Sequence, residues 1–368
     1  MKSRINIIIL SVFLLALLSA CEHDVAMETT VHPDGSLDKM IHIVSGGSFQ
    51  NIQEIRRESD KATIITDDDS PQNILGLSPA DGWALTTRKL HADSSAEGDS
   101  KTIYTFLRHF SSAEEANAAL GTPNDTLFRV TSTFEKKFRW FYTYIYYADT
   151  YHAINRMNYP VTNYTTAEDY AFIDRLPGEG KRITLADSLY LVRLNEKLFD
   201  VYGARALYEE YYGVSIKLLQ HHHVEQQWFD TLQAHKESLY TQVIDKKDIF
   251  GDYMTHVLDS LGIPISHEEA SKWFISELKP LDAKFEFISV ASNAKYHHQI
   301  NMPWDIVRTN ADSISGSQVF WNPPAIKFLL KDYTLYAESR QLNYWAVALS
   351  GGVMALTVFL FVRRRRVA

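Results

Sequence analysis

The C-terminal end of the chain limits its possible structures more than any other stretch. No residue from Tyr344 to Val362 is charged, and the four arginines Arg363 to Arg366 follow directly. A helix of this length extends about 28 Å at 1.5 Å per residue, close to the roughly 30 Å hydrocarbon core of a bilayer. Tyr344 and Trp345 lie at one end, where aromatic rings prefer the membrane interface. We therefore predict a transmembrane helix over 342–362.

The basic residues set the expected topology. The positive-inside rule places the tail 363–368 in the cytoplasm and the preceding chain on the other side of the membrane. Two further uses of this region stay open. Gly351-Gly352 with the apolar run and the arginines is similar to bacterial C-terminal sorting signals, although there the glycines precede the apolar segment. Small residues at 348 and 352 would also permit close packing against a second helix.

The N-terminus is typical of a secreted bacterial lipoprotein. Lys2 and Arg4 precede the apolar run Ile5 to Leu18, which predicts a signal peptide over 1–20. Leu18-Ser19-Ala20-Cys21 resembles a lipobox, so the Cys21 thiol is the expected lipid attachment site; an ordinary signal followed by a stray cysteine is the alternative. Cys21 is the only cysteine, which leaves the mature chain no disulfide. With the C-terminal span, this predicts an inner-membrane protein whose bulk is periplasmic.

The part between these two anchors is acidic. The chain has 37 lysines and arginines and 45 aspartates and glutamates. Without the two basic residues of the leader and the four of the tail, 31 basic residues stand against 45 acidic ones, a net charge of −14. Such a body offers no electrostatic footprint for nucleic acid, so we expect no nucleic-acid partner.

Residues 21–159 are expected to form the first part of a β-rich external domain. Val25 to Val31 and Ser36 to Val44 are predicted strands, joined by the turn His32-Pro33-Asp34-Gly35. Proline presets φ in this turn and glycine accepts a positive φ. Within Thr126 to Tyr147, aromatic residues recur at even spacing, which predicts one long strand or a bent pair; they are Phe134, Phe138, Trp140, Tyr142, Tyr144 and Tyr146. Their stripe serves either as core packing or as a wall of a ligand site.

The pattern changes twice more along the chain. Residues 160–280 have helical periodicity and almost no strand signal, whereas 281–341 return to strands, including Phe285 to Ala291. We predict an α+β fold: an antiparallel β-rich domain built from N- and C-terminal segments, with the helical insertion 160–280 and one C-terminal transmembrane helix. Two successive domains are the alternative, but the few strands at each end favour one shared domain.

Both ends of the chain also resemble a family. Asp34-Gly35-Ser36 shortly after a lipidated cysteine is similar to the start of LppM-like bacterial envelope proteins, and Val307-Arg308-Thr309-Asn310 with Gly316 and Trp321 is similar to their end. The resemblance implies a β-rich extracytoplasmic domain, a single C-terminal span, and lipid binding or envelope handling. Family members often have a glycine after the proline where this chain has Met302-Pro303-Trp304. No functional residue carries over, and the helical insertion is not covered.

Few residues indicate chemistry. His221-His222-His223 and Glu225 lie in helical sequence, where His221 and Glu225 would be one turn apart; His235 or His297-His298 could complete a metal site. However, no His-Glu-x-x-His occurs, and His267-Glu268-Glu269 lacks the second histidine. We therefore assign no catalytic, cofactor-binding or metal-ligating residue and expect no cofactor.

The sequence favours a non-enzymatic envelope lipoprotein tethered to the membrane by its lipid and its C-terminal helix. Its external domain would bind a lipid-like ligand or an envelope protein, with the helical insertion as the contact surface. The alternative is a metal-dependent hydrolase that uses the histidine-rich segment 221–225.

Overall fold

The computed structural model describes residues 24–45, 49, 52–61, 63–65, 77, 79–90, 101–121, 128–246 and 252–367. The predicted signal peptide and Cys21 lie outside these residues. The chain divides into two compact units, one formed by Met1–His152 with Asn293–Ala368 and the other by Ala153–Ser292. Each unit is described separately below.

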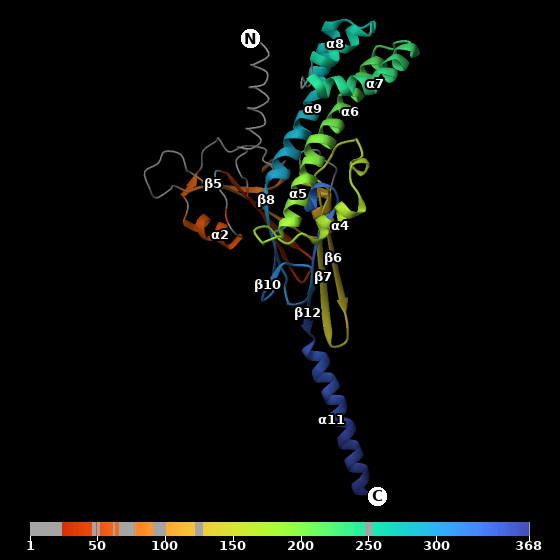
Figure 1. Ribbon diagram of the computed structural model, residues 1–368. Helices are drawn as coiled ribbons and strands as arrows, with labels where there is room; N and C mark the ends of the chain where they lie inside the picture. Colours follow the sequence, from red (N-terminus) through yellow and green to blue (C-terminus); the bar gives the residue numbers. More distant parts are fainter. Residues whose placement is uncertain are drawn as a thin grey trace. The chain divides into compact units, whose positions relative to one another are not determined.

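The first unit contains two sheets, and each takes strands from both ends of the chain (Figure 1). The order in the eight-stranded sheet is β10-β11-β8-β1-β2-β5-β4-β3. Neighbours are antiparallel except for β1 and β8, whose parallel pairing joins the N-terminal segment to residues some 270 positions later. Its strands are β1 Asp24–Val31, β2 Leu37–Ser45, β3 Thr63–Ile65, β4 Ala84–Leu90, β5 Lys101–Phe110, β8 Lys295–Asn301, β10 Ser313–Ser315 and β11 Gln318–Trp321.

The four-stranded sheet leads directly into the apolar C-terminal helix. Its order is β6-β7-β12-β9, all antiparallel. In Figure 1, β6 and β7 run beside β12 toward the start of α11. The bounds are β6 Val130–Phe138, β7 Tyr142–Tyr151, β9 Asp305–Thr309, β12 Tyr333–Leu342 and α11 Tyr344–Val367, and the short helices of this unit are α2 Ile52–Lys61, α3 Ala113–Leu120 and α10 Ile326–Leu329.

The hairpin β1–β2 forms where the sequence predicts it. Its turn requires a glycine at position 35 for two reasons. Gly35 has a φ of +98°, which strains any residue with a side chain. A Cβ on Gly35 would also lie 3.1 Å from the Phe134 ring of β6. The turn is closed by Asp34, whose carboxylate accepts hydrogen bonds from the Ser36 amide and hydroxyl. Of the two alternatives for Thr126 to Tyr147, one long strand or a bent pair, the structure has a pair, the hairpin β6–β7.

The second unit is helical. Its helices are α4 Ala167–Arg175, α5 Leu185–Glu196, α6 Gly203–His221, α7 Gln226–Lys246, α8 Asp252–Ser260 and α9 His267–Asn293, with a π-helical segment Lys197–Tyr202 between α5 and α6. Thr166 and Thr184 cap α4 and α5 by accepting hydrogen bonds from backbone amides in the first turn. Buried aliphatic and aromatic residues of α6 to α9 form one core, among them Leu218, Leu232, Leu258 and Phe274.

One predicted strand is wrong. Phe285 to Ala291 belongs to α9, which continues through Pro280 without ending. Leu278, Leu281 and Phe285 pack against the helical core at three- and four-residue steps, and this burial outweighs the backbone hydrogen bond that Pro280 removes. The α+β fold class with a helical segment between two β-rich segments is confirmed.

Candidate functional site

A small apolar cavity lies beside Lys39 in the first unit. Its volume is about 30 Å³, and its walls include Met27, Ile41, Leu120, Phe128 and Val130. Pockets that bind small molecules have volumes of about 300–1,000 Å³, whereas about 30 Å³ is the share of one water molecule in the liquid. This cavity therefore does not accommodate an acyl chain.

A buried ion pair joins the two sheets. Lys39 of β2 and Asp149 of β7 lie 2.8 Å apart, and both side chains are almost fully buried. Ser132 and Tyr147 donate hydrogen bonds to Asp149 Oδ1 at 2.6 and 2.7 Å, and Thr29 donates to Oδ2 at 3.2 Å. Burial acts to raise the pKa of Asp149, but the Lys39 ammonium and these hydrogen bonds hold it below its usual value. Because the carboxylate is satisfied within the protein, this network is structural.

A larger, polar pocket of about 350 Å³ lies at the β10–β11–β8 end of the eight-stranded sheet. Hydroxyl, amide and imidazole groups dominate its walls. The lining residues are Ile52 and Gln53 of α2 and the sheet residues His297, His298, Ser313, Ser315, Phe320 and Asn322. Its size falls within the range of ligand-binding pockets.

His297 is a buried histidine in the wall of this polar pocket. It is 5% exposed, and its Nδ1 lies 2.9 Å from Asn322 Oδ1. The other ring nitrogen, Nε2, lies 4.0 Å from Asp24 Oδ2 and has no hydrogen-bond partner among the described residues. Buried polar atoms are nearly always hydrogen-bonded, so an atom of this kind beside a cavity indicates a bound polar group or water.

The neighbouring His298 has a different role. Its ring centroid lies 4.7 Å from that of Tyr151 and 5.6 Å from that of Phe328, in an apolar environment. Burial lowers its pKa to about 3, so the ring is neutral at physiological pH. His42, on β2, also has a pKa lowered by burial, to about 4.

The histidine-rich segment does not form the predicted arrangement. α6 ends at His221, His223 has a φ of +50°, and α7 begins only at Gln226, so the expected one-turn spacing of His221 and Glu225 is wrong. Neither histidine nor the β-branched Val224 favours helix strongly, and the chain turns here between two packed helices. The His221 ring instead lies 4.7 Å from Trp273 of α9, and His297 and His298 belong to β8 of the other unit.

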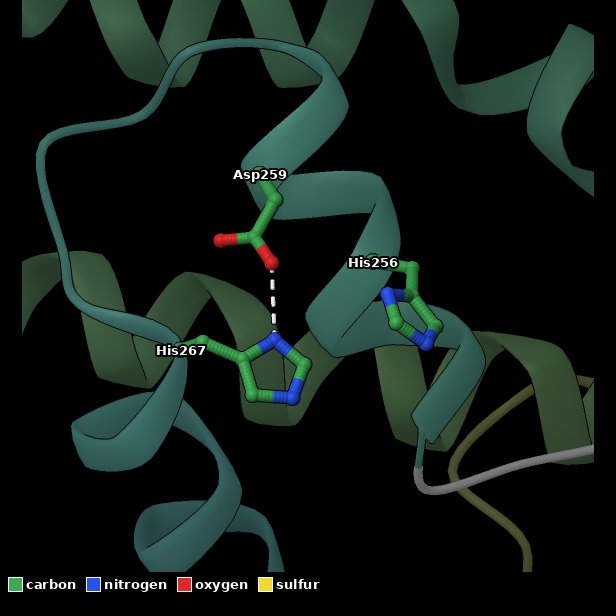
Figure 2. A group of neighbouring side chains, drawn as sticks. All are labelled: His256, Asp259 and His267. Atoms are coloured by element: carbon green, nitrogen blue, oxygen red, sulfur yellow. Dashed lines mark hydrogen bonds and ion pairs between the residues drawn. The ribbon is translucent and has the colours of Figure 1, made fainter.

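A different group in the helical unit has the composition of a metal site (Figure 2). His256 and Asp259 of α8 and His267 of α9 place one donor atom each within 4.8 Å of one another, and all three are exposed. His267 Nδ1 and Asp259 Oδ2 are 2.7 Å apart. Tetrahedral zinc with bonds of about 2.0–2.1 Å needs donors about 3.4 Å apart, a change that exposed side chains can make. The sequence search missed this group because its members are not adjacent in a known motif.

An apolar stripe runs along α5. Leu185, Leu189 and Val192 share one face of the helix and are 77%, 51% and 52% exposed, and Phe199 follows in the π-helical segment with 48%. Contiguous exposed apolar side chains of this kind mark interaction surfaces.

The fold and these sites define a two-unit α+β protein with one candidate membrane span. Among the described residues, one helix is long and apolar enough to cross a membrane, over Tyr344–Arg365 with a mean hydropathy of 2.1. No protein-family model matches the chain, and no curated protein matches it significantly.

Among solved structures, the NMR structure of the folded domain of Mycobacterium tuberculosis LppM is similar, with 8% sequence identity over 88% of this chain and 92% of that chain and a TM-score of 0.24. A similarity this low supports no inference about fold or function.

Proposed function

We propose that this chain is a non-enzymatic lipoprotein of the bacterial envelope that binds a neutral, hydroxyl-rich group in the polar pocket beside His297. α11 would anchor it in the inner membrane with its two units on the periplasmic side, and Cys21 would carry the lipid. The ligand is the headgroup of a glycolipid or the corresponding free sugar, because both present the same chemistry to the pocket.

The observation that carries this proposal is the buried His297 Nε2, which has no hydrogen-bond partner among the described residues. A ligand hydroxyl would donate to it. Ser313, Ser315 and Gln53 offer further hydroxyl and amide partners, and Phe320 offers a ring face. No lysine, arginine or carboxylate is among the described lining residues, which favours a neutral ligand over an anion. The apolar cavity beside Lys39 is too small for a lipid tail, so the protein would hold the polar headgroup or the free sugar alone.

The test uses the full chain in nanodiscs of phosphatidylcholine. Glucosyl diacylglycerol in the disc and methyl glucoside in solution are compared by native mass spectrometry and calorimetry. Ser315→Trp fills the pocket and should abolish binding, whereas Ile314→Trp, on the other face of β10, should not. Binding of the glycolipid alone identifies a headgroup, and binding of both identifies a sugar site. Absence of both, or equal binding by Ser315→Trp, contradicts the proposal.

A second candidate function, a metal-dependent hydrolase, is favoured by the group His256, Asp259 and His267. Two histidines and one carboxylate leave a coordination position for water, as catalytic zinc sites do. Zinc titrated into the full chain should bind with one-to-one stoichiometry, and His256→Ala or His267→Ala should abolish this binding. His235→Ala on α7 is the control, because the hydrogen bond of that ring is to the Thr231 carbonyl of its own helix. Unchanged zinc affinity in His256→Ala and His267→Ala rejects the site.

A further inference from the structure

The tip of the β6–β7 hairpin, Phe138 to Phe141, exposes aromatic side chains to an unusual degree. Phe138, Trp140 and Phe141 are 58%, 48% and 46% exposed. They lie beside the first turn of α11, where Tyr344 and Trp345 are 72% and 55% exposed. Soluble surfaces rarely concentrate large apolar rings in this way.

The hairpin tip is fixed to α11 by direct contacts. The ring centroids of Trp140 and Trp345 lie 5.4 Å apart at an interplanar angle of 71°, and Phe138 stacks on Trp345 at 6.1 Å. Asn343, between β12 and α11, donates from its side chain to the carbonyl groups of Arg139 at 2.8 Å and Trp140 at 3.2 Å.

The Asn343 backbone and side chain complete this junction. The Asn343 amide donates to the Phe141 carbonyl at 2.8 Å, and the Thr143 hydroxyl donates to Asn343 Oδ1 at 2.8 Å. The hairpin tip and the start of α11 therefore form one rigid element.

One hydrogen bond shows how far along α11 the hairpin tip reaches. Trp140 Nε1 donates to Ser350 Oγ at 3.0 Å. Ser350 is six residues beyond Tyr344, which is about 9 Å along the helix axis. The indole therefore lies beside the apolar part of α11, and its one polar group is satisfied there, as a low-dielectric environment requires.

We propose that the hairpin tip inserts into the interface of the same bilayer that α11 crosses, so that the first unit contacts lipid through two elements. This inference rests on the proposed membrane span. A depth of about 9 Å matches the 5–10 Å to which interfacial elements bury their apolar side chains. Glu135 and Lys137, which precede the tip on β6, form an ion pair and would lie among the headgroups. Trp and Phe beside exposed Arg139 are the residues that interfaces favour.

The experiment uses the full chain, labelled with 5-fluorotryptophan, in phosphatidylcholine nanodiscs. The chain has seven tryptophans, and the fluorine resonances of Trp140 and Trp345 are assigned from Trp140→Phe and Trp345→Phe. Lipid carrying a nitroxide at carbon 5 should broaden both resonances, and an aqueous gadolinium chelate should broaden neither. Trp321, 1% exposed, is the internal reference.

The outcomes separate the two proposals. If the lipid probe broadens Trp345 while gadolinium broadens Trp140, the hairpin tip lies in water and the inference fails, although the span stands. If gadolinium broadens both, the span fails as well. If neither probe reaches Trp140 while lipid reaches Trp345, protein covers the tip, and the inference is again overturned.

Discussion

Replacing Lys39 by methionine is expected to destabilise the first unit strongly. The substitution removes the two contacts from Lys39 Nζ to the Asp149 oxygens at 2.9 and 2.8 Å, while Asp149 stays 1% exposed. Breaking a buried ion pair by removing one partner costs about 3–5 kcal/mol, because an uncompensated charge remains. That is a large share of the roughly 5–15 kcal/mol by which a typical domain is stable.

The loss of stability in Lys39→Met should be larger near neutral pH than in acid. Burial acts to raise the pKa of Asp149, and Lys39 with the hydrogen bonds brings it below its usual value. A carboxyl of this kind contributes stability above its unfolded pKa, which is lost as pH falls through the folded one. Without Lys39, burial raises the pKa of Asp149. In mild acid this carboxyl is then protonated, and the variant no longer holds an unpaired buried charge. The difference in free energy of unfolding should be largest near neutral pH and narrow in acid.

Hydrogen exchange of β1 and β2 as a function of urea measures the opening of this unit separately from the helical one. Lys137→Met is the control, because its pair with Glu135 is exposed and should contribute at most about 1 kcal/mol. A loss below about 1 kcal/mol for Lys39→Met at neutral pH, or a difference that widens in acid, would refute this reasoning.

Three further predictions concern single residues. Gly35→Ala should lower the free energy of unfolding by about 1–3 kcal/mol in the same assay, whereas Gly316→Ala, also at positive φ but with open space around it, should lose less. The folded pKa of His298, depressed to about 3, means that stability falls by up to about 1.4 kcal/mol per pH unit below 6.5. His298→Leu should flatten that dependence in acid unfolding. Leu189→Glu, half exposed on α5, should leave unfolding unchanged but reduce co-purification of any envelope protein that docks on the stripe.

Local structure could be predicted well where a few adjacent residues decide it. Pro33-Asp34-Gly35 specifies the turn of β1–β2, and Thr184 specifies the start of α5. The last part of α9 was predicted as the strand Phe285 to Ala291, because Phe285, Phe287 and the neighbouring β-branched residues have strand propensity, whereas their tertiary packing is helical. The parallel pairing of β1 with β8 has no local signal, since it depends on contacts between distant segments.

The candidate sites were less predictable for the same reason. In the sequence, His297 is a candidate only as a metal ligand. Its burial and its contact with Asn322, which leave Nε2 without a hydrogen-bond partner among the described residues, have no pattern in the sequence. The spacing His256-x-x-Asp259 places two possible ligands on one helix face, which is a signal in the sequence. The third, His267, comes near them only through the turn at Gly262, which the spacing does not predict.

The packing of the two sheets also bears on the two predicted membrane anchors, the lipid on Cys21 and the helix α11. Thr29 and Ser132 both donate to Asp149, so β1 and β6 lie side by side at that level. Lys136, nearer the hairpin tip, donates to the carbonyl of Pro33 in the β1–β2 turn. β1 therefore runs toward the hairpin tip, and its first residue points away from it.

If the hairpin tip enters the membrane as proposed, this direction places the start of β1 at the opposite end of the unit from that membrane surface. From Thr29 back to Asp24 is about 16 Å at 3.3 Å per residue, and from Ser132 forward to Arg139 is about 23 Å. The three residues from Cys21 to Asp24 span at most about 10 Å. A lipid on Cys21 thus reaches the leaflet that holds the hairpin tip only if β1 detaches from β2 and β8, whereas a lipid in a facing membrane surface leaves the sheet intact. If Cys21 is lipidated, the fold favours two anchors in opposed surfaces.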